Sequence, residues 1–326
     1  MKNFTVLDLL ELDLKPPRNL DLKCLCGRKG LAREIPLPEI NRPGLALSGF
    51  FELFVGQRMQ VFGQGEFAYL QKLEAEGNFQ YVEKFFAIHP PCCIFCHGLT
   101  PSERFQALSE EYGVSTLHTS LESSDFTVRL LQVLGDIFAP RKTLHGVFVE
   151  VHGTGVLITG ESGVGKSETA LELIGRGGNR LIADDAVLIK RLYGNMLMGY
   201  STNPAMASHM EIRGMGIVNV AQVFGIGAVK ENKQLEIVVD LEEWKAGKVY
   251  DRMGTKSDTV DILGVNVPSI TIPIKPGRNI PIIIETAVLN ERLKQRGYFA
   301  AREFNKDIIQ WLESENARKL YFDNYG

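Results

Sequence analysis

A glycine-rich segment at residues 155–167 has residue types and spacing suited to holding a phosphate chain. Its last eight residues match the pattern G-x-x-x-x-G-K-[ST] at every fixed position. The glycines allow backbone conformations in which successive N–H groups point at one anion, and the N-terminus of a following helix attracts negative charge. The residues of this predicted loop are Gly160, Glu161, Ser162, Gly163, Val164, Gly165, Lys166 and Ser167.

The elements on either side of this segment distinguish a phosphate-binding loop from an ordinary flexible turn. The apolar run 156–158 predicts a strand that leads into the loop, and residues 168–174 predict a helix directly after it. A flexible glycine-rich turn would need neither element. We therefore interpret the segment as a P-loop. Lys166 would supply charge for the β- and γ-phosphates of a nucleotide, and Ser167 a hydroxyl ligand for Mg²⁺.

Two adjacent carboxylates, Asp184 and Asp185, interrupt the apolar stretch 181–189. Burying a carboxylate is costly unless a cation or hydrogen bonds compensate it. In a P-loop protein, Mg²⁺ and Lys166 are the obvious cations. The alternative is a solvated kink in an edge strand.

Residues 208–220 bring an acid, an arginine and two glycines close together. Glu211 and Arg213 suit a second ligand and an anion loop beside the nucleotide. Ser208 and Glu211 also have the spacing of a capping box, which would start a helix and be purely structural.

Residues 275–279 form a basic turn that we expect to join two apolar strands. Pro276-Gly277 is the pair that a type II turn favours at its centre, so the turn could be a connection only. Lys275 and Arg278 also make it a candidate loop for docking a phosphate or a protein. A second predicted turn, at residues 250–254, carries Arg252.

Cysteine and histidine gather at residues 89–97, which resembles the spacing of metal ligands. Cys92 and Cys93 would face opposite sides of a strand, however, and could not share one ion there. We therefore favour a buried strand over 92–95, in which cysteine acts as a small apolar residue.

The bulk composition limits the class of protein. The 326 residues suit two domains, and 44% hydrophobic and 23% charged residues are typical of a globular protein. A net charge of −3 argues against a nucleic-acid binder held by global charge. Acids near the N-terminus, an odd number of cysteines and no apolar run of eighteen residues predict a cytoplasmic protein without a membrane segment.

Helix and strand patterns alternate through residue 120, and a helix is expected over 123–138. We expect an N-terminal α/β domain at residues 1–135, to which no nucleophile, metal set or phosphate loop assigns a role. A second domain is expected at residues 136–326, beginning with a strand over 144–151.

Several motifs together resemble the bifunctional HPr kinase/phosphorylase family. The resemblance rests on His145-Gly146, the P-loop and its helix, Arg180-Leu-Ile-Ala-Asp-Asp185, Glu211-Ile-Arg-Gly-Met-Gly216, Asp251-Arg252 and Pro273-Ile-Lys-Pro-Gly-Arg-Asn279. It covers residues 141–312 closely, and residues 41–46 extend it into the first domain. It implies a P-loop kinase domain with a central mixed sheet, ATP and Mg²⁺ as cofactors, and regulation of carbon metabolism and sugar transport.

The resemblance also implies the partners and the site. The partner is the phosphocarrier protein HPr, whose serine is phosphorylated from ATP or pyrophosphate and dephosphorylated by inorganic phosphate, and the assembly is a hexamer. Asp184 is implied as the general base and acid, Ser167 and Glu211 as magnesium ligands, and residues 211–220 as a segment needed for both activities. The further catalytic residues implied are His145, Lys166 and Arg252, and the loop implied for phosphorolysis is Lys275, Pro276, Gly277 and Arg278.

Two other functions remain as alternatives. One is a P-loop enzyme that acts on a small molecule, such as a metabolite kinase or a carboxykinase. The other is a nucleotide sensor without chemistry, and the Asp184-Asp185 pair argues against it.

Overall fold

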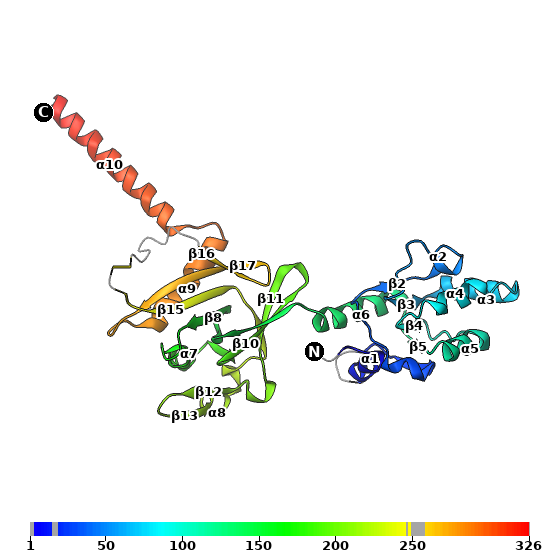
Figure 1. The fold of residues 1–326 in the computed structure, drawn as a ribbon. Helices are drawn as coiled ribbons and strands as arrows, with labels where there is room; N and C mark the ends of the chain where they lie inside the picture. The colour runs from blue at the N-terminus through cyan, green and yellow to red at the C-terminus, as the bar shows by residue number, and fades with distance from the viewer. Residues whose placement is uncertain (1–2, 15–18, 246, 249–257, 326) are drawn as a thin grey trace. The chain divides into compact units, whose positions relative to one another are not determined.

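A computed structural model of the chain describes all residues except 1–2, 15–18, 246, 249–257 and 326 (Figure 1). The chain divides into two compact units, Met1–Ala139 and Pro140–Gly326. Each unit has its own β-sheets and its own apolar clusters. The two units are therefore described in turn.

The first unit is a five-stranded sheet with helices on both faces. Its strand order is β1-β5-β4-β3-β2, and every neighbouring pair is parallel except β1 with β5. The strands are β1 (Lys23–Cys26), β2 (Ile40–Asn41), β3 (Met59–Phe62), β4 (Cys92–Phe95) and β5 (Ser115–His118). The helices are α1 (Val6–Asp13), 3₁₀ helix η1 (Arg28–Ala32), α2 (Gly44–Leu47), α3 (Gln64–Ala75), α4 (Gln80–Ala87), α5 (Glu103–Glu111) and α6 (Ser123–Ile137).

Alternating strand residues divide the core of this unit between the two faces of the sheet. Cys92 and Ile94 pack with α1 and α6, whereas Cys93 and Phe95 pack with α3, α4 and α5. All four residues of β4 are buried, which confirms the predicted strand at 92–95. All five cysteines are free thiols, and burial raises the pKa of Cys92 to about 12. These thiols are packing groups in an α/β fold.

The second unit is built on a six-stranded mixed sheet with the order β16-β17-β15-β8-β7-β9. The P-loop strand β8 is parallel to β15 and antiparallel to β7. The strands are β7 (Val147–Val151), β8 (Thr154–Gly160), β9 (Arg180–Ala183), β15 (Ile237–Glu243), β16 (Asp258–Ile262) and β17 (Val265–Ile274). Helices α7 (Lys166–Gly175) and α9 (Ile280–Gln295) pack on one face and bury a large apolar cluster there.

A second, antiparallel sheet packs on the other face, over the apolar cluster around Phe148 and Leu157. Its strands, in the order β14-β11-β10-β6, are β6 (Arg141–His145), β10 (Ala186–Leu192), β11 (Met196–Ser201) and β14 (Asn232–Gln234). A hairpin and several helices complete the unit: β12 (His209–Ile212), β13 (Gly216–Asn219), α8 (Val220–Phe224), α10 (Ala300–Tyr325), and 3₁₀ helices η2 (Tyr193–Asn195), η3 (Pro204–Met206) and η4 (Ile226–Ala228).

Three local predictions were wrong. The expected single strand at 144–151 is divided by Gly146, so that β6 and β7 belong to different sheets. Glu211 lies in strand β12 and starts no helix, which excludes the capping-box interpretation. The turn at 275–279 leads into helix α9 and not into a strand, because Asn279 caps the helix and Pro281 occupies its first turn.

Candidate active site

The P-loop joins the end of β8 to the start of α7. Gly160, Gly163 and Gly165 all have positive φ angles, of 137°, 87° and 93°. A side chain at Gly160 would also meet the carbonyl oxygen of Leu241 at 2.3 Å, so only glycine fits there. Gly165 is the N-cap of α7 and has no side chain to cover the first N–H groups of the helix. These N–H groups are therefore available to an anion.

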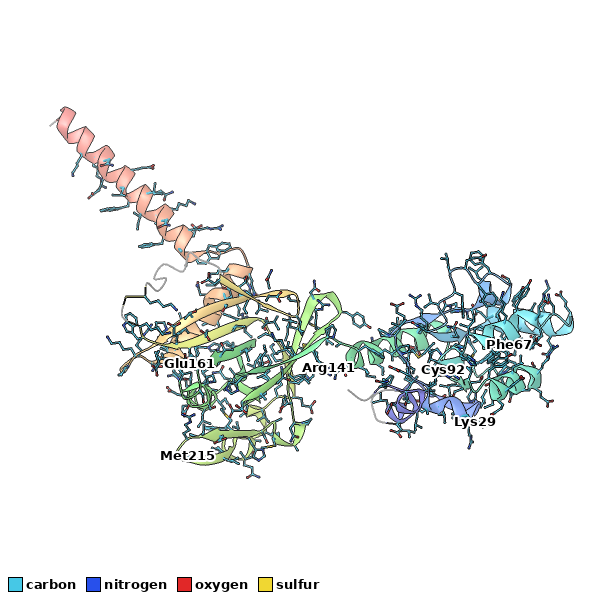
Figure 2. All side chains as sticks on the ribbon, in the orientation of Figure 1. Lys29, Phe67, Cys92, Arg141, Glu161 and Met215 are labelled. Atoms are coloured by element: carbon cyan, nitrogen blue, oxygen red, sulfur yellow. The ribbon has the colours of Figure 1, made fainter. Side chains whose placement is uncertain are left out.

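The P-loop forms one wall of a cavity of about 230 Å³. This phosphate pocket is lined by His145, Val147, Ser162, Gly163, Gly165, Lys166, Ser167, Glu168, Asp184, Asp185, Glu211 and Arg213. Figure 2 labels Glu161 in the P-loop and Met215 at the end of the β12–β13 hairpin, both in the second unit. The pocket thus unites the loop, the aspartate pair, the hairpin and the end of β6.

Lys166 is a buried cation that is held by the loop itself. Its ammonium donates hydrogen bonds to the carbonyl oxygens of Gly160, at 3.0 Å, and Glu161, at 2.9 Å. The residue is only 8% exposed. It is therefore presented to the pocket from a fixed position.

Asp184 and Asp185 form the turn between β9 and β10, and their side chains differ in burial: Asp184 is half-buried and Asp185 is exposed. Asp184 is half-buried and accepts hydrogen bonds from the Ser167 hydroxyl, at 3.0 Å, and the Glu211 backbone N–H, at 3.1 Å. Burial raises the pKa of Asp184 above its ordinary value, although these hydrogen bonds oppose the effect. The structure therefore combines both interpretations of the pair: Asp184 faces the P-loop, and Asp185 is a solvated kink.

The solvated residue of the pair contacts the candidate histidine. Asp185 has a left-handed backbone, with φ of 66°, and its side chain is 79% exposed. The Nδ1 atom of His145 lies 3.1 Å from an Asp185 carboxylate oxygen. His145 is the last residue of β6 and pairs with Ala186 of β10, so sheet pairing brings it beside the aspartate turn.

The β12–β13 hairpin contacts the P-loop directly. An Arg213 guanidinium nitrogen donates to the Ser162 hydroxyl at 3.1 Å, while Glu211 exposes its carboxylate beside the pocket. From the sequence, Arg213 was named only as part of a candidate anion loop and was not counted among the catalytic or nucleotide-binding residues. The structure places its guanidinium in the wall of the phosphate pocket.

The remaining predicted residues lie elsewhere. Arg252 is outside the described residues. Gly277 and Arg278 do not line the phosphate pocket, but they line a neighbouring cavity that shares Gly165 and Glu168 with it. Lys275 lies over the Trp244 ring, 5.6 Å from its centroid.

Comparison with known proteins agrees with this geometry. A family model described as HPr Serine kinase N terminus matches residues 6–134, and one described as HPr Serine kinase C-terminal domain matches residues 136–308. The chain belongs to the HPr serine kinase family.

Relatives in this family match the chain over nearly its whole length. The HPr kinase/phosphorylase of Treponema pallidum (strain Nichols) is 52% identical, and the match covers 96% of this chain and 98% of the relative. The HPr kinase/phosphorylase of Leptospira biflexa is 44% identical, with 94% and 95% covered. A solved structure of the Hpr(Ser) kinase/phosphatase from Coxiella burnetii is 40% identical, with a TM-score of 0.44 and 50% and 98% covered.

Membership of the HPr serine kinase family makes the chain a bifunctional kinase/phosphorylase, and neither alternative, a small-molecule enzyme or a non-catalytic sensor, is favoured. The family implies that a nucleotide is used, which agrees with the P-loop. Among the described residues, no helix is long and apolar enough to cross a membrane.

The oxygen atoms around the pocket suit a magnesium ion. The Ser167 hydroxyl and the carboxylate of Glu211 line the same cavity. No group of three His, Cys, Asp or Glu side chains in the described ranges could hold a metal without other ligands. Because Mg²⁺ commonly takes one or two protein carboxylates and completes its shell with phosphate oxygens and water, this donor set fits a nucleotide-bound Mg²⁺.

Proposed function

We propose that this protein transfers a phosphoryl group from ATP or pyrophosphate to a serine of HPr and reverses the transfer with inorganic phosphate. The names of its relatives supply the partner. The main support for this chemistry is the hydrogen bond from the Ser167 hydroxyl to Asp184, because it holds a carboxylate beside the P-loop.

In the forward direction, Asp184 accepts the proton of the serine hydroxyl while the serine oxygen attacks the γ-phosphorus. The new bond joins serine oxygen to phosphorus, and the bond from phosphorus to the β–γ bridging oxygen breaks, so that ADP leaves. With pyrophosphate as donor, inorganic phosphate leaves instead. Lys166, fixed by two loop carbonyls, donates to the phosphate oxygens as negative charge develops on the leaving group.

In the reverse direction, an oxygen of inorganic phosphate attacks the phosphorus of phosphoserine. Pyrophosphate forms, and the serine oxygen leaves with the proton of Asp184. A carboxyl whose pKa is raised by burial suits this double role, because its two protonation states are closer in free energy at neutral pH than those of an exposed aspartate.

Other residues would handle charge around this transfer. Ser167 and Glu211 would hold Mg²⁺, which would neutralise negative charge on the phosphates. His145, beside Asp185, and Arg252 are assigned to phosphate contacts by the family resemblance, and residues 211–220 to both activities. The loop of Lys275 to Arg278 is assigned to phosphorolysis in the same way. A cytoplasmic hexamer that regulates sugar transport completes the proposal.

The decisive experiment uses purified protein, HPr and labelled ATP, followed by excess inorganic phosphate. We expect phosphoserine on HPr first, and then its loss with formation of pyrophosphate. HPr in which the target serine is replaced by alanine is the control. Inert HPr together with turnover of a metabolite would support a small-molecule kinase, and nucleotide binding without any transfer would support a sensor.

A further inference from the structure

A pair of polar side chains, Thr159 and Asp240, lies at the point where β8 enters the P-loop. The two residues are paired in the register of β8 with β15. The pair two residues earlier on the same face, Leu157 and Val238, is buried in the apolar cluster against the second sheet. The face of the sheet therefore changes from apolar to polar one residue before Gly160, the first glycine of the loop.

A hydrogen bond joins the two side chains across the strands. The Thr159 hydroxyl donates to a carboxylate oxygen of Asp240 at 2.8 Å. Asp240 is half-buried, and it forms no ion pair with any residue that the structure describes. The contact with Thr159 is therefore the one that links this carboxylate to the P-loop strand.

The next residue, Gly160, has no side chain that could fix the orientation of its peptide groups. Its φ angle is 137°, and the approach of the Leu241 carbonyl leaves no room for a larger residue. Its own carbonyl oxygen has a specific contact, because it accepts a hydrogen bond from the Lys166 ammonium at 3.0 Å. The orientation of this carbonyl must come from neighbouring residues, and Thr159 is the neighbour whose side chain is bonded to another strand.

These contacts connect Asp240 to the cation of the phosphate pocket. Asp240 holds Thr159, Thr159 is covalently joined to Gly160, and the Gly160 carbonyl holds the Lys166 ammonium. In phosphoryl transfer the protein acts mainly by positioning groups and by stabilising charge. A displacement of about 1 Å in such a group can cost about 10²-fold in rate, so a contact two residues away can matter.

We propose that Asp240 is a positioning residue for phosphoryl transfer, because through Thr159 it fixes the Gly160 carbonyl that orients Lys166. This inference rests on the proposed function, in which Lys166 donates to the phosphate oxygens. Asp240 itself takes no proton and contacts no phosphate. Since ATP and pyrophosphate both use Lys166, the two donors should depend on Asp240 equally.

The first test is Thr159→Val, which removes the hydroxyl but keeps a β-branched side chain suited to a strand. We expect kcat for phosphorylation of HPr to fall by about tenfold with either donor, while the KM for HPr stays within about twofold. Asp240→Ala should have the same effect. Asp240→Asn should keep kcat within about threefold of wild type, because its amide oxygen can still accept from Thr159.

A double variant and a matched control separate positioning from general damage. Thr159→Val combined with Asp240→Ala should lose no more activity than the worse single variant, because both remove one contact. Thr271 is paired with Asp240 on the other side and lines the same cavity of about 320 Å³, so Thr271→Val is the control. Its kcat should stay within about twofold of wild type.

Thermal unfolding and active-site titration with ADP accompany these assays. A purely structural pair would lower the Tm of Thr159→Val while kcat per folded active site stayed normal. That result would overturn the proposal, and so would additive losses in the double variant or an equal loss in Thr271→Val.

Calorimetric titration with ADP tests the same contact without HPr. Lys166 is expected to contact the β-phosphate of ADP, so Thr159→Val should weaken ADP binding by about threefold or more and Thr271→Val should not. If wild-type protein fails to phosphorylate HPr, the proposed function fails, but a selective loss of ADP affinity in Thr159→Val would still support the positioning role. Equal ADP affinity in both variants would refute it.

Discussion

Replacing Asp184 with asparagine separates the proposed proton transfer from nucleotide binding. The two side chains have nearly the same size, and both contacts of Asp184 can persist in the variant. The amide oxygen can accept from the Glu211 N–H, and the amide NH₂ can donate to the Ser167 hydroxyl, which rotates its own proton away. The geometry of the P-loop should therefore survive the change.

What the variant loses is the proton acceptor. General-base catalysis contributes roughly 10²–10⁴-fold to a rate, so kcat for phosphorylation of HPr should fall by about that factor. Phosphorolysis should fall in parallel, because the same group returns the proton. ADP should bind as well as to wild type or better, since a negative charge near the phosphates has been removed.

The assay pairs single-turnover transfer of labelled phosphate to HPr with equilibrium binding of ADP. Asp185→Asn is the matched control, because its left-handed backbone tolerates asparagine and its side chain faces solvent and His145. We expect that control to lose at most about tenfold in kcat. If Asp184→Asn keeps more than about a tenth of wild-type kcat, or the control loses as much, Asp184 is not the base.

Four further outcomes are expected. Because burial raises the folded pKa of Asp184, its ionisation costs stability as pH rises through that pKa, so Asp184→Asn should be more stable than wild type to urea at neutral pH, an advantage that disappears near pH 3.8. Lys166→Met should lower kcat with ATP by about 10²–10³-fold with little change in thermal unfolding, and near-normal turnover would contradict its role. Glu150→Gln should destabilise the protein by about 2 kcal/mol, because this side chain is only 8% exposed and forms ion pairs with three cations; chemical denaturation would measure the loss. Burial alone would raise the Glu150 pKa, but the lysines lower it overall, so the wild-type advantage should fade as pH falls through that lowered pKa. Arg278→Ala should weaken phosphorolysis more than ATP-driven phosphorylation, since inorganic phosphate has no nucleoside to anchor it; equal losses in paired assays would count against this.

The elements that could be predicted from the sequence are those fixed by local chemistry. The P-loop needs glycine where the backbone has positive φ or where Leu241 approaches Gly160. The glycines that meet this need lie within one short segment, so the sequence pattern alone reveals the loop. Helix α6 starts and ends where its serines and the following Ala-Pro pair indicate. The buried strand β4 was predictable because its cysteines alternate between the two faces of a sheet.

The features that escaped prediction depend on contacts between distant segments. Gly146 lies between β6 and β7, and a side chain there would meet the Ile158 carbonyl oxygen at 2.5 Å. This requirement for glycine comes from a contact with another strand, which local patterns do not contain. The first turns of helix α9 were mistaken for a strand because the Ile282-Ile283-Ile284 run is β-branched. The Asn279 cap and Pro281 were the better indicators, since caps fix a helix start more firmly than propensity does.

The contacts of Asp184 also explain why different segments should affect the two reactions differently. This carboxylate accepts hydrogen bonds both from the hydroxyl of Ser167 in helix α7 and from the backbone N–H of Glu211. The side chain of Glu211 is itself the candidate metal ligand. A change in the β12–β13 hairpin should therefore move the proposed proton acceptor, the candidate metal ligand and the Arg213 contact together, and in the proposed mechanism both directions of transfer use the first two. The loop at 275–279 does not line the phosphate pocket. It lines the neighbouring cavity, which shares Gly165 and Glu168 with that pocket. Substitutions in the hairpin should thus reduce kinase and phosphorylase activity alike, whereas substitutions in the loop should change the ratio between them.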